Sequence, residues 1–300
     1  MPPISDRINS KKIYDVPSIR GKTISFNFDG LTMRRFFYIF IFSLFCLIQA
    51  KAMQPFLPVP RAKKMALTFD ACMTSGMLKK IESGSEPALY NAAIVDFLRS
   101  EKIAATFFIT GLWAEKYPNV VKALAAEPLF EIGNHSYSHR GFVENCFSLP
   151  NLPEKEKAAD IRQSQEILFQ LTGKKPALFR FPGGCFSPAD QALVKTNGLS
   201  VVGWSFASGD AFNSNTTAIV ENVLEKAKSG AIVVFHLSGG RYAPKSAEVL
   251  KIIVPELKKR GFEFVTVSTL LRMNSQSAIS GAMVPGGEVK ISTYPATKAK

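Results

Sequence analysis

The stretch MALTFD at residues 65–70 places a short apolar segment directly before a carboxylate. A nearly continuous apolar run of this length predicts a strand buried on both faces, as in a parallel sheet covered by helices. Similar runs recur at 105–109, 130–132, 178–181, 200–206, 231–235 and 263–267. Amphipathic segments predict helices at 89–98, 120–126, 154–171, 188–197, 217–228 and 245–260. This alternation predicts an α/β fold, and about seven such units favour a barrel over a two-layer sheet.

The composition is that of a globular protein with a basic surface. Of its 300 residues 46% are hydrophobic and 20% charged, and the formal net charge is +13. Such a charge suits an anionic partner such as cell wall or membrane, although it also serves plain solubility. We find no basic helix or aromatic–basic repeat, so we expect no nucleic-acid partner.

The N-terminal region has the pattern of a signal peptide. A basic segment at 33–35 (MRR) precedes an apolar run at 36–48 and an AKA cleavage motif at 50–52. The run is too short for a membrane-spanning helix, so we expect cleavage, no remaining membrane span, and a periplasmic or secreted protein. Translation is then expected to start at Met33, with residues 1–32 a non-native extension.

The remaining chain divides into one domain and a tail. We expect a single globular domain over 53–273 and a flexible tail over 274–300, which is rich in Ser, Gly, Pro and Lys. The exported chain would keep Cys72, Cys146 and Cys185. Since cysteines tend to pair outside the cytosol, an odd number predicts at least one free or intermolecular thiol.

Residues with chemical potential follow several predicted strands. Asp70 ends the first strand, where it can act as a general base or a metal ligand, although a loop carboxylate alone is more often a cap. His135 and His139 are four residues apart, a spacing that suits a shared Zn²⁺ or similar ion. These two are among only three histidines in the chain.

Three further groups lie at strand ends. The segment RFPGG at 180–184 contains glycines whose backbone N–H groups can approach a ligand closely, or which simply form a turn. Asp210 follows the run at 200–206. His236 follows another apolar run, a position typical both of a satisfied core histidine and of a general acid.

Taken in order, these residues resemble the five motifs of the polysaccharide deacetylase family, the NodB-homology enzymes of carbohydrate esterase family 4. The matching segments are 68–70 (TFD), 135–139 (HSYSH, preceded by Gly-Asn), 180–184 (RFPGG), 204–210 (WSFASGD) and 234–236 (VFH). The resemblance covers roughly residues 63–270. It implies a distorted (β/α)7 barrel and a metal-dependent hydrolase that removes N-acetyl groups from a polysaccharide.

The resemblance also implies the roles of single residues. His135 and His139 align with the family's metal-binding histidines, Asp70 with its catalytic base, and the backbone near Gly183 with its oxyanion donor. His236 aligns with the general acid that protonates the leaving amine.

The remaining aligned residues have supporting roles. Arg180 aligns with the arginine that positions the base. Asp210 aligns with the carboxylate that tunes the general acid or the arginine network. Trp204, which opens the fourth motif, is expected on the substrate side.

Two departures from the family pattern affect the metal site and the arginine network. The family usually has a second aspartate after the base as third metal ligand, and Ala71 stands there. Three alternatives follow: two histidines and waters hold the metal, the Cys72 thiolate substitutes and favours Zn²⁺, or the site is empty. The converging motifs also suggest a Cys72–Cys185 disulfide, which would remove the thiolate. In the fourth motif Ala207 replaces an aspartate.

We therefore expect a Zn²⁺-dependent deacetylase of peptidoglycan or a chitin-like glycan. One alternative is an amidohydrolase that acts on a small non-sugar amide. Another is a non-catalytic glycan-binding relative that has lost its metal site. The presence of Asp70 and His236 favours catalysis, because a binding domain needs neither a base nor an acid.

Overall fold

The computed structural model describes residues 12–16, 24–28 and 62–279. The chain forms two units, Met1–Arg61 and Ala62–Lys300. In the first unit, β1 (Lys12–Val16) pairs with β2 (Ile24–Phe28) in antiparallel register. The predicted signal peptide at 33–52 lies outside the described residues.

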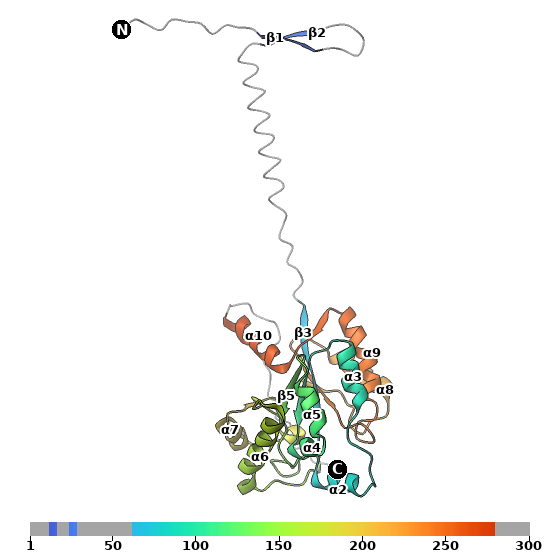
Figure 1. Cartoon of the computed structure of the whole chain (residues 1–300), viewed down its shortest axis with the longest axis vertical. Coiled ribbons are helices and arrows are strands. Elements are labelled where there is room, and N and C mark those ends of the chain that lie inside the picture. The colour runs from blue at the N-terminus through green and yellow to red at the C-terminus, as the bar shows by residue number, and fades with distance from the viewer. Residues whose placement is uncertain (1–11, 17–23, 29–61, 280–300) are drawn as a thin grey trace, which may run out of the picture. The chain divides into compact units, whose positions relative to one another are not determined.

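The second unit is built on one parallel sheet (Figure 1). Its strands are β3 (Lys63–Ala71), β4 (Ala105–Ile109), β5 (Phe130–Asn134), β6 (Leu178–Phe179), β7 (Ser200–Val201), β8 (Phe206–Ala207), β9 (Ile232–His236) and β10 (Phe262–Phe264). The order is β7-β6-β5-β4-β3-β9-β8, and β10 pairs with the first residues of β3. The seven strands in this order form a barrel that is left open between β7 and β8, and β10 lies outside the order. This arrangement confirms the predicted distorted (β/α)7 fold.

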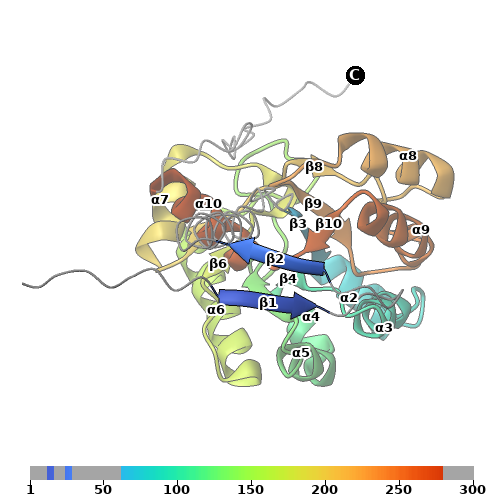
Figure 2. The same ribbon diagram turned by 90° about the horizontal axis from the view of Figure 1, so that it is seen from above.

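Helices surround the strands, as seen from above in Figure 2. They are α2 (Ser75–Glu82), α3 (Ala92–Ser100), α4 (Gly111–Lys116), α5 (Pro118–Ala125), α6 (Glu154–Thr172), α7 (Pro188–Thr196), α8 (Thr216–Lys226), α9 (Ser246–Lys259) and α10 (Val267–Ile279). Local chemistry sets several of their ends. Helix α6 ends at Gly173, whose φ of 71° suits glycine. Helix α7 begins with Pro188 after Ser187, which shares a capping box with Asp190.

The prediction of one continuous strand over 200–206 is wrong. The structure divides it into β7 and β8, separated by residues 202–205, because each half pairs with a different strand. Helix α10 continues past Met273 to Ile279, so its backbone is helical where we expected the tail to begin. Among the described helices, none is both long and apolar enough to cross a membrane.

Strand β3 lies at the centre of the core. Its residues from Met65 to Ala71 are all buried. The Phe69 ring stacks on Phe107 of β4 at 5.3 Å and on Phe235 of β9 at 5.8 Å between centroids. This packing holds the three strands in one register, and that register places Asp70 directly opposite His236.

Candidate active site

The candidate residues meet at the carboxyl ends of the strands, the edge where parallel barrels build their sites. Asp70 belongs to the end of β3 and His236 to the end of β9. His135 directly follows β5, and Arg180 directly follows β6. The structure thus brings residues from four strands to one mouth.

Arg180 is fully buried and holds Asp70. One terminal nitrogen donates to the Asp70 carboxylate at 2.7 Å and to the Thr68 hydroxyl at 2.8 Å. The other guanidinium nitrogens donate to the carbonyls of Val202 at 3.4 Å and Gly203 at 3.1 Å, on the segment between β7 and β8. The guanidinium therefore satisfies backbone oxygens where the barrel is open.

The fourth motif has Ala207 in place of an aspartate. In this chain the carbonyls of Val202 and Gly203 accept hydrogen bonds from the Arg180 guanidinium instead. Burial alone would raise the pKa of Asp70, but Arg180 and the nearby histidines outweigh it and lower that pKa below its ordinary value. Asp70 is therefore ionised at neutral pH.

The two histidines of the HSYSH segment are neutral and face one another. Burial lowers the pKa of His135, and it lowers the pKa of His139 to about 3. The His135 Nδ1 lies 2.8 Å from the carbonyl of Arg180, to which it can only donate. That bond fixes the tautomer and leaves the Nε2 lone pair free, 3.6 Å from the nearer Asp70 oxygen.

The His135 Nε2 is a buried polar atom with no hydrogen-bond partner among the described residues. Such atoms are uncommon because an unmade hydrogen bond is costly in the interior. The Cys72 sulfur and the ligand nitrogens of His135 and His139 all lie within 4.8 Å of one another. The three side chains thus have the donor types and the spacing of a metal site.

The loop that carries the histidines is held by the Asp160 carboxylate, which lies outside the five motifs, and by the amide of Asn134, which directly precedes the second motif. Asp160 on α6 accepts from the backbone of Tyr137 at 2.7 Å and from the Ser138 hydroxyl at 2.6 Å. The Asn134 side chain accepts from the backbone of Ser136 at 2.8 Å. Asp160 is an acidic residue at a buried position of α6. An acidic residue at such a position of a predicted helix is the feature by which the sequence could have indicated it.

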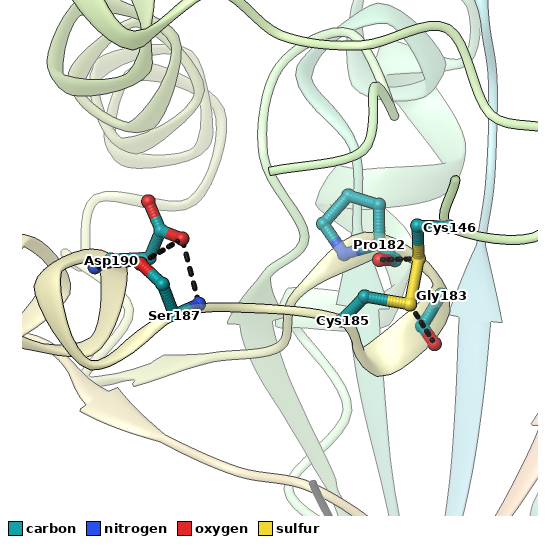
Figure 3. Close-up of a disulfide and its surroundings, with 6 residues drawn as sticks. All are labelled: Cys146, Pro182, Gly183, Cys185, Ser187 and Asp190. Carbon is teal, nitrogen blue, oxygen red and sulfur yellow. Dashed lines mark hydrogen bonds between the residues drawn. A yellow bond between two sulfur atoms is a disulfide. The ribbon is translucent and has the colours of Figure 1, made fainter. Parts of the chain in front are cut away.

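The disulfide in the structure joins Cys146 to Cys185, so the expected Cys72–Cys185 pair is wrong (Figure 3). Cys185 follows the turn η1 (Pro182–Gly184), and the loop with Cys146 packs on that turn, whereas Cys72 is buried just beyond β3. Cys72 is the free thiol that the odd cysteine count predicted. Burial, with Asp70 and Asp210 nearby, raises its pKa well above the usual 9.0.

Gly183 lies inside the turn that the disulfide clamps. Its φ is 64°, and a Cβ there would come within 2.6 Å of the Cys146 sulfur. Only glycine fits this position without displacing the Cys146 loop, so close packing between the loop and the turn accounts for the glycine. The oxyanion role of the Gly183 backbone stays a prediction.

His236 is paired with Asp210 on the other side of the mouth. The Asp210 carboxylate accepts from the His236 ring at 2.9 Å and from its backbone N–H at 2.8 Å. Ser246, which begins α9, donates to the same carboxylate at 2.6 Å and was not predicted from the sequence. Burial would lower the pKa of His236, but Asp210 outweighs it and raises that pKa.

A family model described as polysaccharide deacetylase matches residues 58–202. A peptidoglycan-N-acetylglucosamine deacetylase of Bacillus cereus is 36% identical over 217 residues, which are 71% of this chain and 91% of that relative. The chain belongs to the polysaccharide deacetylase family. The family and the enzyme class predicted from the motifs are thereby confirmed.

Solved structures of this deacetylase family share the barrel. Peptidoglycan deacetylase PdaC from Bacillus subtilis matches with a TM-score of 0.59 and 27% identity, over 74% of this chain and 96% of that structure. This chain aligns with 40% of the full PdaC sequence. A family 4 acetyl xylan esterase from Clostridium thermocellum, solved with a cobalt ion, matches with a TM-score of 0.58 and 25% identity, over 71% and 92%.

Trp204 lies next to Arg180 in this deacetylase. Its ring is 5.6 Å from the Arg180 guanidinium, and a Cβ on Gly184 would come within 2.4 Å of it. The ring thus packs against the arginine and the turn, and it is partly exposed. A contact between Trp204 and substrate stays a prediction.

The Asp210–His236 pair makes a testable prediction about the titration of one histidine. In metal-free protein, we expect His236 to titrate above its ordinary 6.5, and Asp210→Asn to lower its pKa. A raised pKa means that the pair stabilises the fold fully below pH 6.5 and loses this contribution as pH rises through the shifted value. Proton NMR of the three imidazoles measures this directly. An unchanged His236 titration in Asp210→Asn would contradict the assignment.

Proposed function

We propose that this chain is a divalent-metal-dependent hydrolase that removes N-acetyl groups from peptidoglycan or a related N-acetylated glycan of the cell envelope. The observation that carries the proposal is that Asp70, held by Arg180, and His236, held by Asp210, lie opposite one another at the barrel mouth. A base and an acid held in opposite charge states are what amide hydrolysis requires. Relatives named peptidoglycan deacetylases support the choice of substrate.

The chain's own residues fit a metal ion. His135 offers an unpartnered Nε2, His139 is neutral, and the Cys72 sulfur lies within reach of both. Two imidazoles and a sulfur form a donor set that suits Zn²⁺ better than a hard oxygen-seeking cation. A bound Zn²⁺ would supply Lewis acidity to the acetamide carbonyl and a lowered pKa to a coordinated water.

Arg180 prepares Asp70 to act as the general base. One Asp70 oxygen accepts from Arg180, and the other faces His135. The first contact fixes the carboxylate and keeps it ionised, while the second oxygen can accept a proton from the attacking water. The Gly183 region offers backbone donors to the developing oxyanion.

His236 completes the reaction from the opposite side. Its Nδ1 is held by Asp210, so the other ring nitrogen is the one that can donate a proton to the leaving amine. The Asp210 carboxylate stabilises the charged imidazolium before the transfer and orients the ring throughout.

Loss of the family's second aspartate at Ala71 is the one observation that favours a non-catalytic glycan-binding protein. The fold does not decide between the two, since a CE4 family pseudoenzyme from Bacillus anthracis has it too, with a TM-score of 0.55 at 20% identity. The site favours catalysis, because the buried Asp70–Arg180 pair and the Asp210–His236 pair have no evident use in binding a neutral sugar.

We expect the protein to release acetate from peptidoglycan and N-acetylglucosamine oligomers when Zn²⁺ is present, and to stop when a chelator is added. Asp70→Asn and His236→Ala should each lower kcat by about 10²–10⁴-fold, as expected for loss of a general base or acid. Asp96→Asn on α3, an exposed carboxylate, is the control and should retain activity.

The outcomes of this experiment separate the alternatives. Glycan binding without acetate release from any acetylated glycan would favour the binding protein. Hydrolysis of small non-sugar amides alone would favour the amidohydrolase.

The proposed Cys72 ligand predicts a spectroscopic signature. Co²⁺ bound to a thiolate gives an intense near-ultraviolet charge-transfer band, which we expect in the protein and not in Cys72→Ala. Metal affinity should fall in that variant by more than about 10-fold, since even residues behind the ligands contribute this much. The Cys146–Cys185 disulfide leaves Cys72 as the free thiol of the described residues. Co²⁺ binding without the band would show that the histidines hold the ion without sulfur.

We also propose that the protein is exported. The Cys146–Cys185 disulfide supports an oxidising compartment. Peptidoglycan, the substrate named for the relatives, also lies in the envelope. Sequencing the N-terminus of the secreted protein should give Met53. A mature protein that retains residues 1–32 would contradict both the cleavage site and the start at Met33.

A further inference from the structure

Two phenylalanines near the mouth are exposed without a reason in the fold. Phe147 has 71% and Phe212 has 75% of its surface accessible. Both have positive φ, 47° and 57°. A bulky residue with positive φ is strained, and such strain is concentrated at ligand-binding segments. Strain and an exposed apolar ring both cost stability, which points to a ligand.

Phe147 stands on the oxyanion side of the mouth. It follows Cys146, whose disulfide ties this loop to the turn at Gly183. The Phe147 ring comes within 3.2 Å of the position that a Gly183 Cβ would occupy. The ring is therefore next to the turn and is held there by a covalent link.

Phe212 stands on the side of the general acid. It lies two residues after Asp210, which binds His236. Its backbone N–H donates to the carbonyl of Tyr242 at 2.8 Å, and its ring meets the Tyr242 ring edge-on at 5.5 Å. These contacts fix the loop while the Phe212 ring stays exposed.

The strand order places the two rings on opposite sides of the reacting centre. Phe147 follows β5 and Phe212 follows β8, and each of these strands is two places from β3, in opposite directions. Asp70 lies at the end of β3 between them. A chain of sugars that crosses the mouth over Asp70 would meet an aromatic ring on either side.

We propose that Phe147 and Phe212 are two stacking platforms for the sugar rings that flank the residue being deacetylated. The ligand that contacts both rings is then a pyranose oligomer of at least three residues, whereas a single sugar would reach only the reacting centre. The C–H groups on one face of a pyranose form an apolar surface that matches the face of a phenyl ring. Two separate rings on either side of a polar centre suit such a polymer better than a protein partner, which would need a contiguous apolar patch.

This inference rests on the proposed function, and its test uses substrate length. The variants are Phe147→Asn and Phe212→Asn, because asparagine tolerates positive φ better than most residues. The matched control is Phe169→Asn. Phe169 is also exposed, near the end of α6 that leads into the start of β6, the end of the barrel away from the mouth.

We expect each platform variant to lower kcat/KM for an N-acetylglucosamine pentamer by about tenfold, equivalent to about 1.4 kcal/mol. Activity on the monomer should not change. Phe147→Trp and Phe212→Trp should retain activity on the pentamer, as should the control. The Tm of the two Asn platform variants should not fall below that of the wild type, because asparagine relieves the strain of positive φ.

Equal losses on monomer and pentamer would overturn the proposal, because they would show that the rings support the site's structure. No loss on either substrate would also overturn it. If the wild-type protein releases no acetate, the proposed function fails by itself. Calorimetric titration of the same variants with the pentamer then tests the platforms separately. We expect the two Asn variants to bind the pentamer more weakly than the wild type. Unchanged affinity would refute the platforms.

Discussion

The buried guanidinium of Arg180 is the group on which the rest of the site depends. The barrel is open between β7 and β8, and Arg180 donates to the backbone carbonyls of that segment. The same side chain holds Asp70 ionised, and its own carbonyl sets the tautomer of His135. A charge that deep is stable only when it is fully paired, so the fold and the Asp70 carboxylate stabilise one another.

Ala71 stands where the family usually has an aspartate, and the neighbouring Cys72 would give the proposed metal site a sulfur in place of that carboxylate oxygen. A thiol with a raised pKa must lose its proton before it can coordinate, so metal binding at Cys72 would release a proton and strengthen as pH rises. Sulfur in place of oxygen also shifts preference toward softer ions. Metal choice in this chain would then depend on one side chain.

The two sides of the mouth are stabilised by different means. On one side, a disulfide joins the Cys146 loop to the Gly183 turn. On the other, Asp210 accepts hydrogen bonds from both His236 and Ser246, which ties three chain segments together. Both arrangements position groups before substrate arrives, which lowers the reorganisation needed during reaction.

Much of the architecture could be predicted from local patterns. The strand at 105–109 has the bounds that its apolar run predicted, and α6 (Glu154–Thr172) extends one residue beyond the predicted 171 and ends directly before Gly173. Asp70 and the two histidines also stand where their motifs predicted, at strand ends that meet at one edge. Periodicity and short motifs act within a few residues, so the sequence alone determined these features.

The tertiary structure decided what depends on distant pairing. The partner of Cys185, the split of 200–206, and the contributions of Asp160 and Ser246 follow from which loops come together. No local pattern encodes those contacts, because they join segments that are far apart along the chain. The sequence offered Cys72 as one of three alternatives for the third ligand of a metal, and the folded barrel places its sulfur within 4.8 Å of the ligand nitrogens of both histidines.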